Sequence, residues 1–336
     1  MSPNKGKTFI DRLMPAPLGG GFKMEDYWVW CGSVIKGEDG KYHMFASRWP
    51  KKYPMFSGYI LASEIVRAVS DKPEGPYQFV EKILPSGYEN AWDGRMVHNP
   101  SICRWEGEYL LYYIGSTYSG TMNVPADNSG SPQCDESYAN IRIGLAAAPS
   151  VEGPWKTLDM PILEPRPEKW DSRIVTNPAP CLLPGGRVLL YYRSNTPQGL
   201  RIGLAVADSP KSPYRRLKDG PILEGMNVED PFAWYNGTGF EMLAKDMSGD
   251  ITGEIHAGAH LHSQDGVKWI ADGKGYSRNV LWNDGRRVMQ GCLERPQILF
   301  DSDAKPQFLF AAIADGPGGF RNASNTWTAA IPLSHP

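Results

Sequence analysis

The hydrophobic positions of this chain fall into short runs, separated by turns, that recur at similar intervals from end to end. A unit contains an apolar run, a turn, two further apolar runs, and a Gly/Pro-rich turn before a stretch of alternating polarity. The second run of each unit is the most regular, and the five copies are Tyr42–Ala46, Tyr109–Tyr113, Val188–Tyr192, Phe240–Leu243 and Phe308–Phe310. Short apolar runs bounded by Gly and Pro predict an all-β protein built from antiparallel hairpins.

One phrase at the start of these units is repeated almost unchanged. Trp92–Pro100 (WDGRMVHNP) returns as Trp170–Pro178 (WDSRIVTNP), displaced by 78 positions. Looser copies follow at Glu229–Pro231 and Glu294–Pro296, and we assign an earlier one to Glu25–Tyr27. Self-similarity on this scale, carried by short strands, is typical of a β-propeller.

A second motif, ending in an aromatic residue, closes the units and fixes their phase. Its copies are Glu74–Tyr77, Glu152–Trp155, Lys211–Tyr214 and Asp265–Trp269. From Asp26 to Arg295 the unit starts are spaced by about 67 residues, so five units fill the 336 residues. We therefore predict a single domain, residues 1–336, that forms a five-bladed propeller with four-stranded antiparallel blades around a central pocket. The N-terminal segment, residues 1–25, is expected to close the last blade, with residues 7–10 supplying its fourth strand.

Composition narrows the possible functions. The net charge of −2 offers no basic stripe, so we expect no nucleic-acid partner. No apolar run approaches transmembrane length, and no signal peptide is visible at the N-terminus. We expect a soluble protein with no membrane partner, cytoplasmic or secreted after removal of a signal. Its oligomeric state is not indicated. The five cysteines have no CxxC spacing and the histidines no ligand spacing, so no metal and no cofactor are predicted.

The candidate catalytic and binding residues lie where the inner strands of a propeller begin and its second strands end, because these points surround one mouth of the central tunnel. Carboxylates at this mouth would repel one another, which raises the pKa of at least one of them. A proton donor beside a proton acceptor is what glycoside hydrolysis requires. The predicted catalytic residues are Asp26, Asp230 and Glu294.

Other polar and aromatic residues near this mouth are candidates for binding substrate. They are Trp28, Arg48, Arg95, His98, Asn99, Asn177, Arg193, Glu229, Lys245, His256 and Arg295. For Asn99 and Asn177, capping of a turn before proline explains the residue equally well. His256, expected on the third strand of blade four, is either a surface histidine or a general acid. Trp28, Trp30 and Trp49 are alternatives for a sugar-stacking platform.

These motifs resemble the five-bladed glycoside hydrolases of families 43, 32 and 117, over nearly the whole chain from Asp26 onward. The resemblance implies hydrolysis of a terminal sugar, of furanoside, arabinose, xylose, fructose or anhydrogalactose type. It also implies a blade-one aspartate as base or nucleophile, at Asp26, which we expect to be the base. An acid is implied in blade four, where Glu229-Asp230-Pro231 resembles the acid motif. We expect Asp230 to be the acid, with Glu229 and His256 as alternatives.

The chain also departs from these families. Blade three has Asn177 where family 43 has an aspartate, and His98-Asn99-Pro100 replaces the Arg-Asp-Pro of family 32. The Asn-Pro and Glu-Asp-Pro motifs are also similar to those of family 130 phosphorylases, so phosphorolysis is one alternative. A non-catalytic sugar-binding propeller is another. The predicted function is exo-acting hydrolysis of an oligosaccharide, and the cations around the mouth leave open whether the sugar carries an anionic group.

Overall fold

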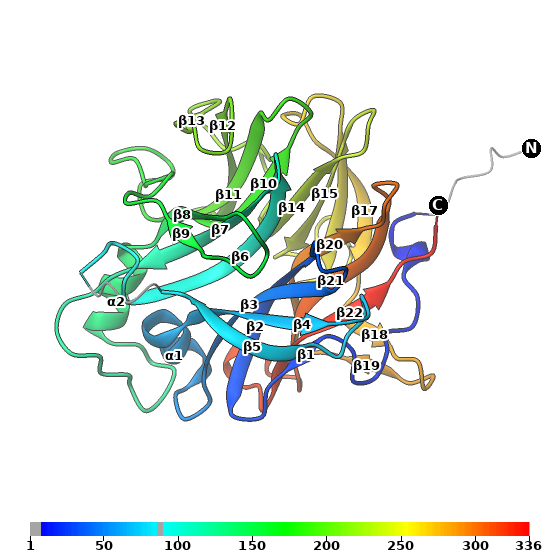
Figure 1. The fold of residues 1–336 in the computed structure, drawn as a ribbon, viewed down its shortest axis with the longest axis horizontal. Helices are drawn as coiled ribbons and strands as arrows, with labels where there is room; N and C mark the ends of the chain where they lie inside the picture. Colours follow the sequence, from blue (N-terminus) through cyan, green and yellow to red (C-terminus); the bar gives the residue numbers. More distant parts are fainter. Residues whose placement is uncertain (1–7, 86–89, 336) are drawn as a thin grey trace, which may run out of the picture.

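The computed structural model of the protein describes residues 8–85 and 90–335. Over these residues, five four-stranded sheets surround a common axis (Figure 1). Every strand pairing in these blades is antiparallel, and each inner strand pairs with the next strand along the chain. The prediction of a five-bladed propeller is thereby confirmed.

The blades follow the chain, with each inner strand first. Blade one consists of β2 (Tyr27–Lys36), β3 (Tyr42–Pro50), β4 (Glu64–Ser70) and β5 (Gln78–Leu84). Blade two consists of β6 (Met96–Trp105), β7 (Glu108–Ser116), β8 (Arg142–Ala148) and β9 (Lys156–Thr157). Blade three consists of β10 (Thr176–Leu182), β11 (Val188–Thr196), β12 (Gly199–Ala207) and β13 (Arg215–Arg216). Blade four consists of β14 (Val228–Tyr235), β15 (Phe240–Asp246), β16 (Gly258–Ser263) and β17 (Ile270–Tyr276).

Blade five joins the two ends of the described chain. It consists of β20 (Cys292–Phe300), β21 (Pro306–Ala314), β22 (Thr326–Pro332) and, outermost, β1 (Phe22–Lys23). Figure 1 shows the red β22 beside the blue N-terminal segment, and Phe22 pairs with Thr328. Residues 7–10, which we expected to supply this strand, do not: Lys7 lies outside the described residues, and Ile10–Arg12 forms the 3₁₀ helix η1. The closing strand thus lies later in the N-terminal segment than predicted.

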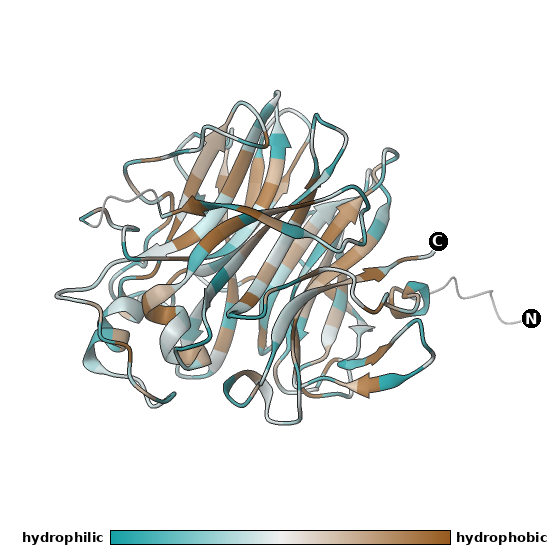
Figure 2. Cartoon of the chain, turned by 60° about the horizontal axis from the view of Figure 1, so that its bottom comes forward, coloured by the Kyte–Doolittle hydropathy of each residue, from teal (hydrophilic) through white to brown (hydrophobic). Residues whose placement is uncertain are grey.

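Insertions between strands add to the propeller. Helix α1 (Met55–Ala62) follows β3, α2 (Pro132–Ala139) follows β7, and the 3₁₀ helix η2 (Gly319–Arg321) follows β21. The hairpin of β18 (Asn279–Leu281) and β19 (Arg287–Met289) precedes blade five. Hydrophobic residues lie along the strands and hydrophilic ones in the connecting loops (Figure 2). No helix in the described part of the chain is long and apolar enough to cross a membrane.

The repeated Trp-Asp phrase has a structural role in two neighbouring blades. Trp92 stacks on Tyr113 at 6.0 Å between ring centroids, and the hydroxyl of Tyr113 donates to Asp93 at 2.5 Å. Blade three repeats this arrangement, since Trp170 stacks on Tyr192 and the Tyr192 hydroxyl donates to Asp171 at 2.8 Å. The phrase therefore anchors the entry loop of each blade to its second strand.

Candidate active site

The five inner strands share one backbone irregularity near the axis. Each carries a β-bulge in the same part of its ladder, and each bulge holds one residue of positive φ. These residues are Cys31 (φ 56°), Asn99 (54°), Asn177 (54°), Asp230 (55°) and Arg295 (54°). Asn and Asp tolerate this conformation better than other non-glycine residues, and a bulge redirects the side chain it carries. In four of the blades a proline follows the bulge residue, and in blade one Gly32 takes its place.

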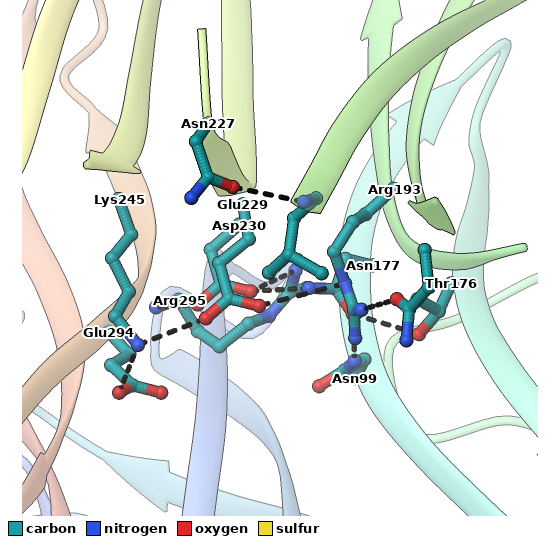
Figure 3. Close-up of polar contacts among 12 residues, drawn as sticks. Asn99, Thr176, Asn177, Arg193, Asn227, Glu229, Asp230, Lys245, Glu294 and Arg295 are labelled. Carbon is teal, nitrogen blue, oxygen red and sulfur yellow. Dashed lines mark hydrogen bonds and ion pairs between the residues drawn. The ribbon is translucent and has the colours of Figure 1, made fainter. Parts of the chain in front are cut away.

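The bulge residues Asn99, Asn177, Asp230 and Arg295 lie close together (Figure 3), and Cys31 joins them through Asn99 to form a polar ring. The thiol of Cys31 donates to Asn99 Oδ1 at 2.8 Å, and Asn99 Nδ2 donates to Asn177 Oδ1 at 2.8 Å. Asn177 Nδ2 in turn donates to Asp230 Oδ1. Asp230 Oδ2 accepts from the backbone N–H of Arg295 at 3.1 Å, and the Arg295 guanidinium lies 3.5 Å from Oδ1. All five residues are buried.

The ring corrects the predicted start of blade one. Cys31, not Asp26, is the blade-one equivalent of Asn99 and Asp230, because Cys31 carries the matching bulge and φ. Asp26 is exposed, precedes β2 and lines a separate cavity. Burial raises the pKa of the Cys31 thiol well above its ordinary value, so this position is a neutral thiol at neutral pH. The expectation that Asp26 shares the central pocket is therefore wrong.

Three carboxylates do converge beside the ring, on Glu229, Asp230 and Glu294. One oxygen of each lies within 4.8 Å of the others. Lys245, on β15, lies between two of them: its Nζ donates to Glu229 at 3.0 Å and to Glu294 at 2.5 Å (Figure 3). Arg193, on β11, lies 3.6 Å from the other oxygen of Glu229. This trio could also hold a metal ion, but the Lys245 ammonium already supplies a positive charge between Glu229 and Glu294.

The surroundings of Glu229 and Asp230 shift the pKa values of these two carboxyl groups in opposite directions. Burial favours protonation of Glu229, but the charges of Lys245 and Arg193 outweigh it and hold the pKa of Glu229 below its usual value. Burial, and next the charge of Glu229, raise the pKa of Asp230 to about 6. The nearby Arg295 opposes this rise, and we take burial as decisive because the guanidinium approaches no closer than 3.5 Å. Asp230 can therefore carry a proton in a pH range where Glu229 is ionised.

His98 lies next to the ring but is a poor proton carrier. Its Nδ1 is 2.8 Å from the hydroxyl of Ser63, and its ring lies 4.8 Å from that of Tyr59. Burial, and next the charge of Arg295, lower the pKa of His98 to about 3. The imidazole is neutral at ordinary pH and is suited to hydrogen bonding rather than to acid catalysis.

A pocket of about 530 Å³ rises from this cluster at the mouth of the propeller. The residues that line it come from every blade, and they include the predicted residues His98, Asn99, Asn177, Arg193, Glu229, Asp230, Lys245, Glu294 and Arg295. Its walls are aromatic: Trp30, Phe56, Tyr59, Tyr138 and Phe320. A second cavity, of about 470 Å³, lies farther along the inner strands and shares no lining residue with the pocket, so the buried ring forms a floor.

Four predicted binding residues lie outside this pocket. Arg193 and Lys245 occupy equivalent positions on the second strands of blades three and four. Arg48 lies one residue after the corresponding position of blade one, so its side chain lies on the opposite face of the strand. It bonds Glu64 at 2.8 Å and lies against Tyr27 and Phe79. Arg95 lines another cavity, beside Tyr118.

Trp28 and His256 are the other two. Trp28 Nε1 donates to the carbonyl of Tyr53 at 2.9 Å, which commits this indole to packing, and Trp30 faces the pocket instead. His256 precedes β16 rather than lying on it, and its φ is 65°. Burial and the charge of Lys245 lower the pKa of His256. It is close enough to sense this charge but does not line the pocket.

Several pocket residues were missed in the sequence. Phe56 and Tyr59 lie on α1, Tyr138 on α2, and Phe320 and Arg321 on η2, all in insertions after second strands. The sequence signal for these residues was the length of the connections that carry them. These connections are longer than a hairpin turn and leave their blades at the mouth of the propeller. The Cys31-Gly32 position lacks the proline that follows each of its four counterparts.

No protein-family model and no curated protein sequence matches the chain. The fold, however, is similar to that of a family 117 glycoside hydrolase from the marine bacterium Zobellia galactanivorans, with a TM-score of 0.68 and 16% identity over 96% of this chain and 89% of the other. The protein BT0996, in its complex with RGII, gives a TM-score of 0.64 at 16% identity, covering 97% and 93%. The arabinanase Arb43A of Bacillus subtilis gives 0.56 at 14%, covering 91% and 94%. The predicted resemblance to five-bladed glycoside hydrolases is thus confirmed in fold.

Proposed function

We propose that this protein is a glycoside hydrolase that removes a terminal sugar from an oligosaccharide. The observation that carries the proposal is the convergence of Glu229, Asp230 and Glu294 within 4.8 Å at the base of an aromatic-walled pocket. Carboxylates this close together can act as the paired groups of a glycosidase, whereas a purely binding propeller has no need of three largely buried carboxylates side by side. The fold shared with hydrolases of families 117 and 43 supports the same reaction class.

In this proposal Asp230 is the proton donor. The leaving oxygen of a glycoside needs a proton as the bond breaks, and a carboxyl group with a pKa of about 6 can hold one near neutral pH. Glu229, kept ionised by Lys245 and Arg193, is a positioning residue whose charge contributes to the raised pKa of Asp230. This division of roles follows the pattern of paired carboxyls in unequal environments.

Glu294 is the proposed nucleophile. Its Oε1 accepts from Lys245, which leaves Oε2 to attack the anomeric carbon. Inverting enzymes leave room for a water between carboxyl groups about 6.5–9.5 Å apart, whereas here one oxygen of each carboxylate lies within 4.8 Å of the others, so we propose the retaining course. Attack forms a glycosyl ester while Asp230 protonates the leaving oxygen. Water, deprotonated by Asp230, then cleaves the ester and restores both groups.

The pocket suits one terminal sugar. Lys245 lies between Glu229 and Glu294, and Arg193 lies beside Glu229, so carboxylates neutralise these two cations. Arg295 lies 3.5 Å from Asp230, but its guanidinium makes no hydrogen bond within the described residues, and Arg321 also lines the pocket. Phosphorolysis therefore stays the alternative, and the phosphate dependence of turnover distinguishes the two reactions. The closed floor favours exo-action. The resemblance to known families suggests a furanoside, arabinose, xylose or anhydrogalactose unit.

A substrate screen tests this proposal. Nitrophenyl glycosides and short oligosaccharides of these sugars would be incubated with and without inorganic phosphate, and the product anomer followed by NMR. We expect release of a terminal sugar with retained configuration and no need for phosphate. Strict phosphate dependence would make the protein a phosphorylase, mid-chain fragments would exclude exo-action, and absence of turnover on every substrate would contradict an enzymatic role.

A further inference from the structure

A cleft of about 720 Å³, larger than the pocket of the candidate active site, lies beside that pocket. Blade one, blade five and the β18–β19 hairpin form its walls. It reaches the face that carries the active site, because Asp26 and Gln290 lie just before the inner strands β2 and β20. The connection between β21 and β22 separates the two cavities: Asp315 lines the cleft, whereas Phe320 lines the pocket.

Aromatic rings form much of this cleft. Tyr27 and Phe79 hold the Arg48 guanidinium between them, at 4.2 and 4.1 Å from the ring centroids. Trp282 and Trp327 lie opposite, with ring centroids 6.4 Å apart. Phe79 is 41% exposed, which leaves one face of its ring available. Apolar walls with a few polar groups are the usual composition of a small-molecule site.

The polar groups of the cleft are mainly hydrogen-bond acceptors. The carboxylates of Glu25 and Asp26 are exposed and make no hydrogen bond or ion pair with residues 8–85 or 90–335. Gln290 is 4% exposed, and its Nε2 donates to the Val288 carbonyl at 3.3 Å. Its Oε1 accepts no hydrogen bond from the described residues. This oxygen is not sealed from solvent, so a ligand that carries hydroxyl groups can donate to it.

We propose that this cleft binds the part of the oligosaccharide that lies beyond the bond being cleaved. The inference rests on the proposed glycosidase function for the identity of the ligand. Sugar rings present C–H faces to aromatic side chains and hydroxyl donors to carboxylate and amide oxygens, and the cleft offers both partners. A chain whose terminal unit occupies the closed pocket must leave through the mouth, and the β21–β22 connection leads from there to the cleft.

Affinity electrophoresis tests the proposal without relying on turnover. The double variant Asp26→Asn/Phe79→Ala removes one acceptor charge and one aromatic face, and Asp303→Asn makes the same amide change at an exposed site outside both cavities. Gels would contain arabinan, xylan, pectin or agar. We expect at least one polysaccharide to retard the wild type and Asp303→Asn, and the double variant to lose about tenfold in affinity. Melting temperatures would verify that each variant folds.

Chain-length dependence supplies a second readout. For the sugar identified by the screen, the ratio of kcat/KM for a hexasaccharide to that for a disaccharide should fall about tenfold in the double variant, through KM. Retardation by none of the gels, or equal retardation of wild type and double variant, would overturn the cleft proposal even if Asp230 and Glu294 prove catalytic. Conversely, cleft-dependent retardation without turnover would show that the cleft binds a polysaccharide, but it would remove the proposed hydrolase function and with it the assignment of the cleft to the far side of a cleaved bond.

Discussion

Replacing Lys245 by methionine perturbs the centre of the proposed site with little change in side-chain size. The Lys245 ammonium is buried and bonds Glu229 at 3.0 Å and Glu294 at 2.5 Å. Removing one member of a buried ion pair leaves the other charge uncompensated and typically costs about 3–5 kcal/mol. At the 2 °C or so per kcal/mol expected of a large domain, the melting temperature should fall by roughly 6–10 °C at pH 8.

The pH dependence of this loss makes the prediction sharper. Without the ammonium group, burial raises the pKa of Glu229, so the folded variant takes up a proton that the unfolded chain does not bind. A carboxyl group whose pKa is raised on folding favours the folded state at low pH and loses that advantage as pH rises. The deficit of Lys245→Met should therefore be smaller at pH 5 than at pH 8.

Differential scanning fluorimetry at both pH values measures this effect. Lys211→Met is the matched control, because Lys211 bonds Glu108 at 2.6 Å on the surface, with 46% of its side chain exposed. Such a pair contributes about 0–1 kcal/mol. A Lys245→Met protein that melts within about 2 °C of the wild type at pH 8, or with the same deficit at pH 5, would refute our account of the buried charge cluster.

Three further predictions address the donor, the ring and the closure of the propeller. The value of kcat/KM should fall about tenfold per pH unit above about pH 6 as Asp230 loses its proton, and a profile flat to pH 8 would remove Asp230 as the acid. Asn177→Asp puts a like charge beside Asp230 and raises its pKa, so the fall of kcat/KM should begin about one pH unit or more higher. A fall that begins at the same pH as in the wild type would contradict the ring geometry. Phe22 lies on the closing strand and is 1% exposed, so Phe22→Ala should lower the free energy of unfolding, measured by chemical denaturation, by about 3–5 kcal/mol. Leu18→Ala, at a residue that is 50% exposed, should lower it much less, and equal losses would contradict closure by β1.

The sequence was most informative where a repeated residue has the same physical role in more than one blade. The Trp-Asp phrase recurs because Trp92 and Trp170 each stack on a second-strand tyrosine, so the phrase marked two blades in phase. The bulge residues followed by proline marked further site positions. Blade count and strand number could therefore be predicted from spacing, together with the charged and amide side chains at the base of the pocket.

The failures have equally specific causes. At its bulge, blade one carries Cys31-Gly32 instead of a residue followed by proline. The sequence therefore did not mark Cys31 as the equivalent position, and the acidic Asp26 was chosen instead. Arg48 was misplaced by one residue, which in a strand is enough to reverse the face that a side chain occupies. The aromatic walls on α1 and α2 come from insertions whose return to the mouth depends on tertiary packing, and no periodicity encodes that.

The central claim is that Asp230 donates the proton to a departing sugar in the axial pocket, and leaving-group dependence tests it most directly. Asp230→Asn would be assayed on a disaccharide and on the dinitrophenyl glycoside of the same terminal sugar, with Asp303→Asn as control. A dinitrophenolate leaves without a proton, and kcat/KM reports only the steps up to formation of the glycosyl ester. We therefore predict that kcat/KM falls at least about 10²-fold on the disaccharide and little on the aryl glycoside, whose kcat falls because the introduced amide cannot deprotonate the water. Equal losses on both substrates, or none on either, would contradict the account.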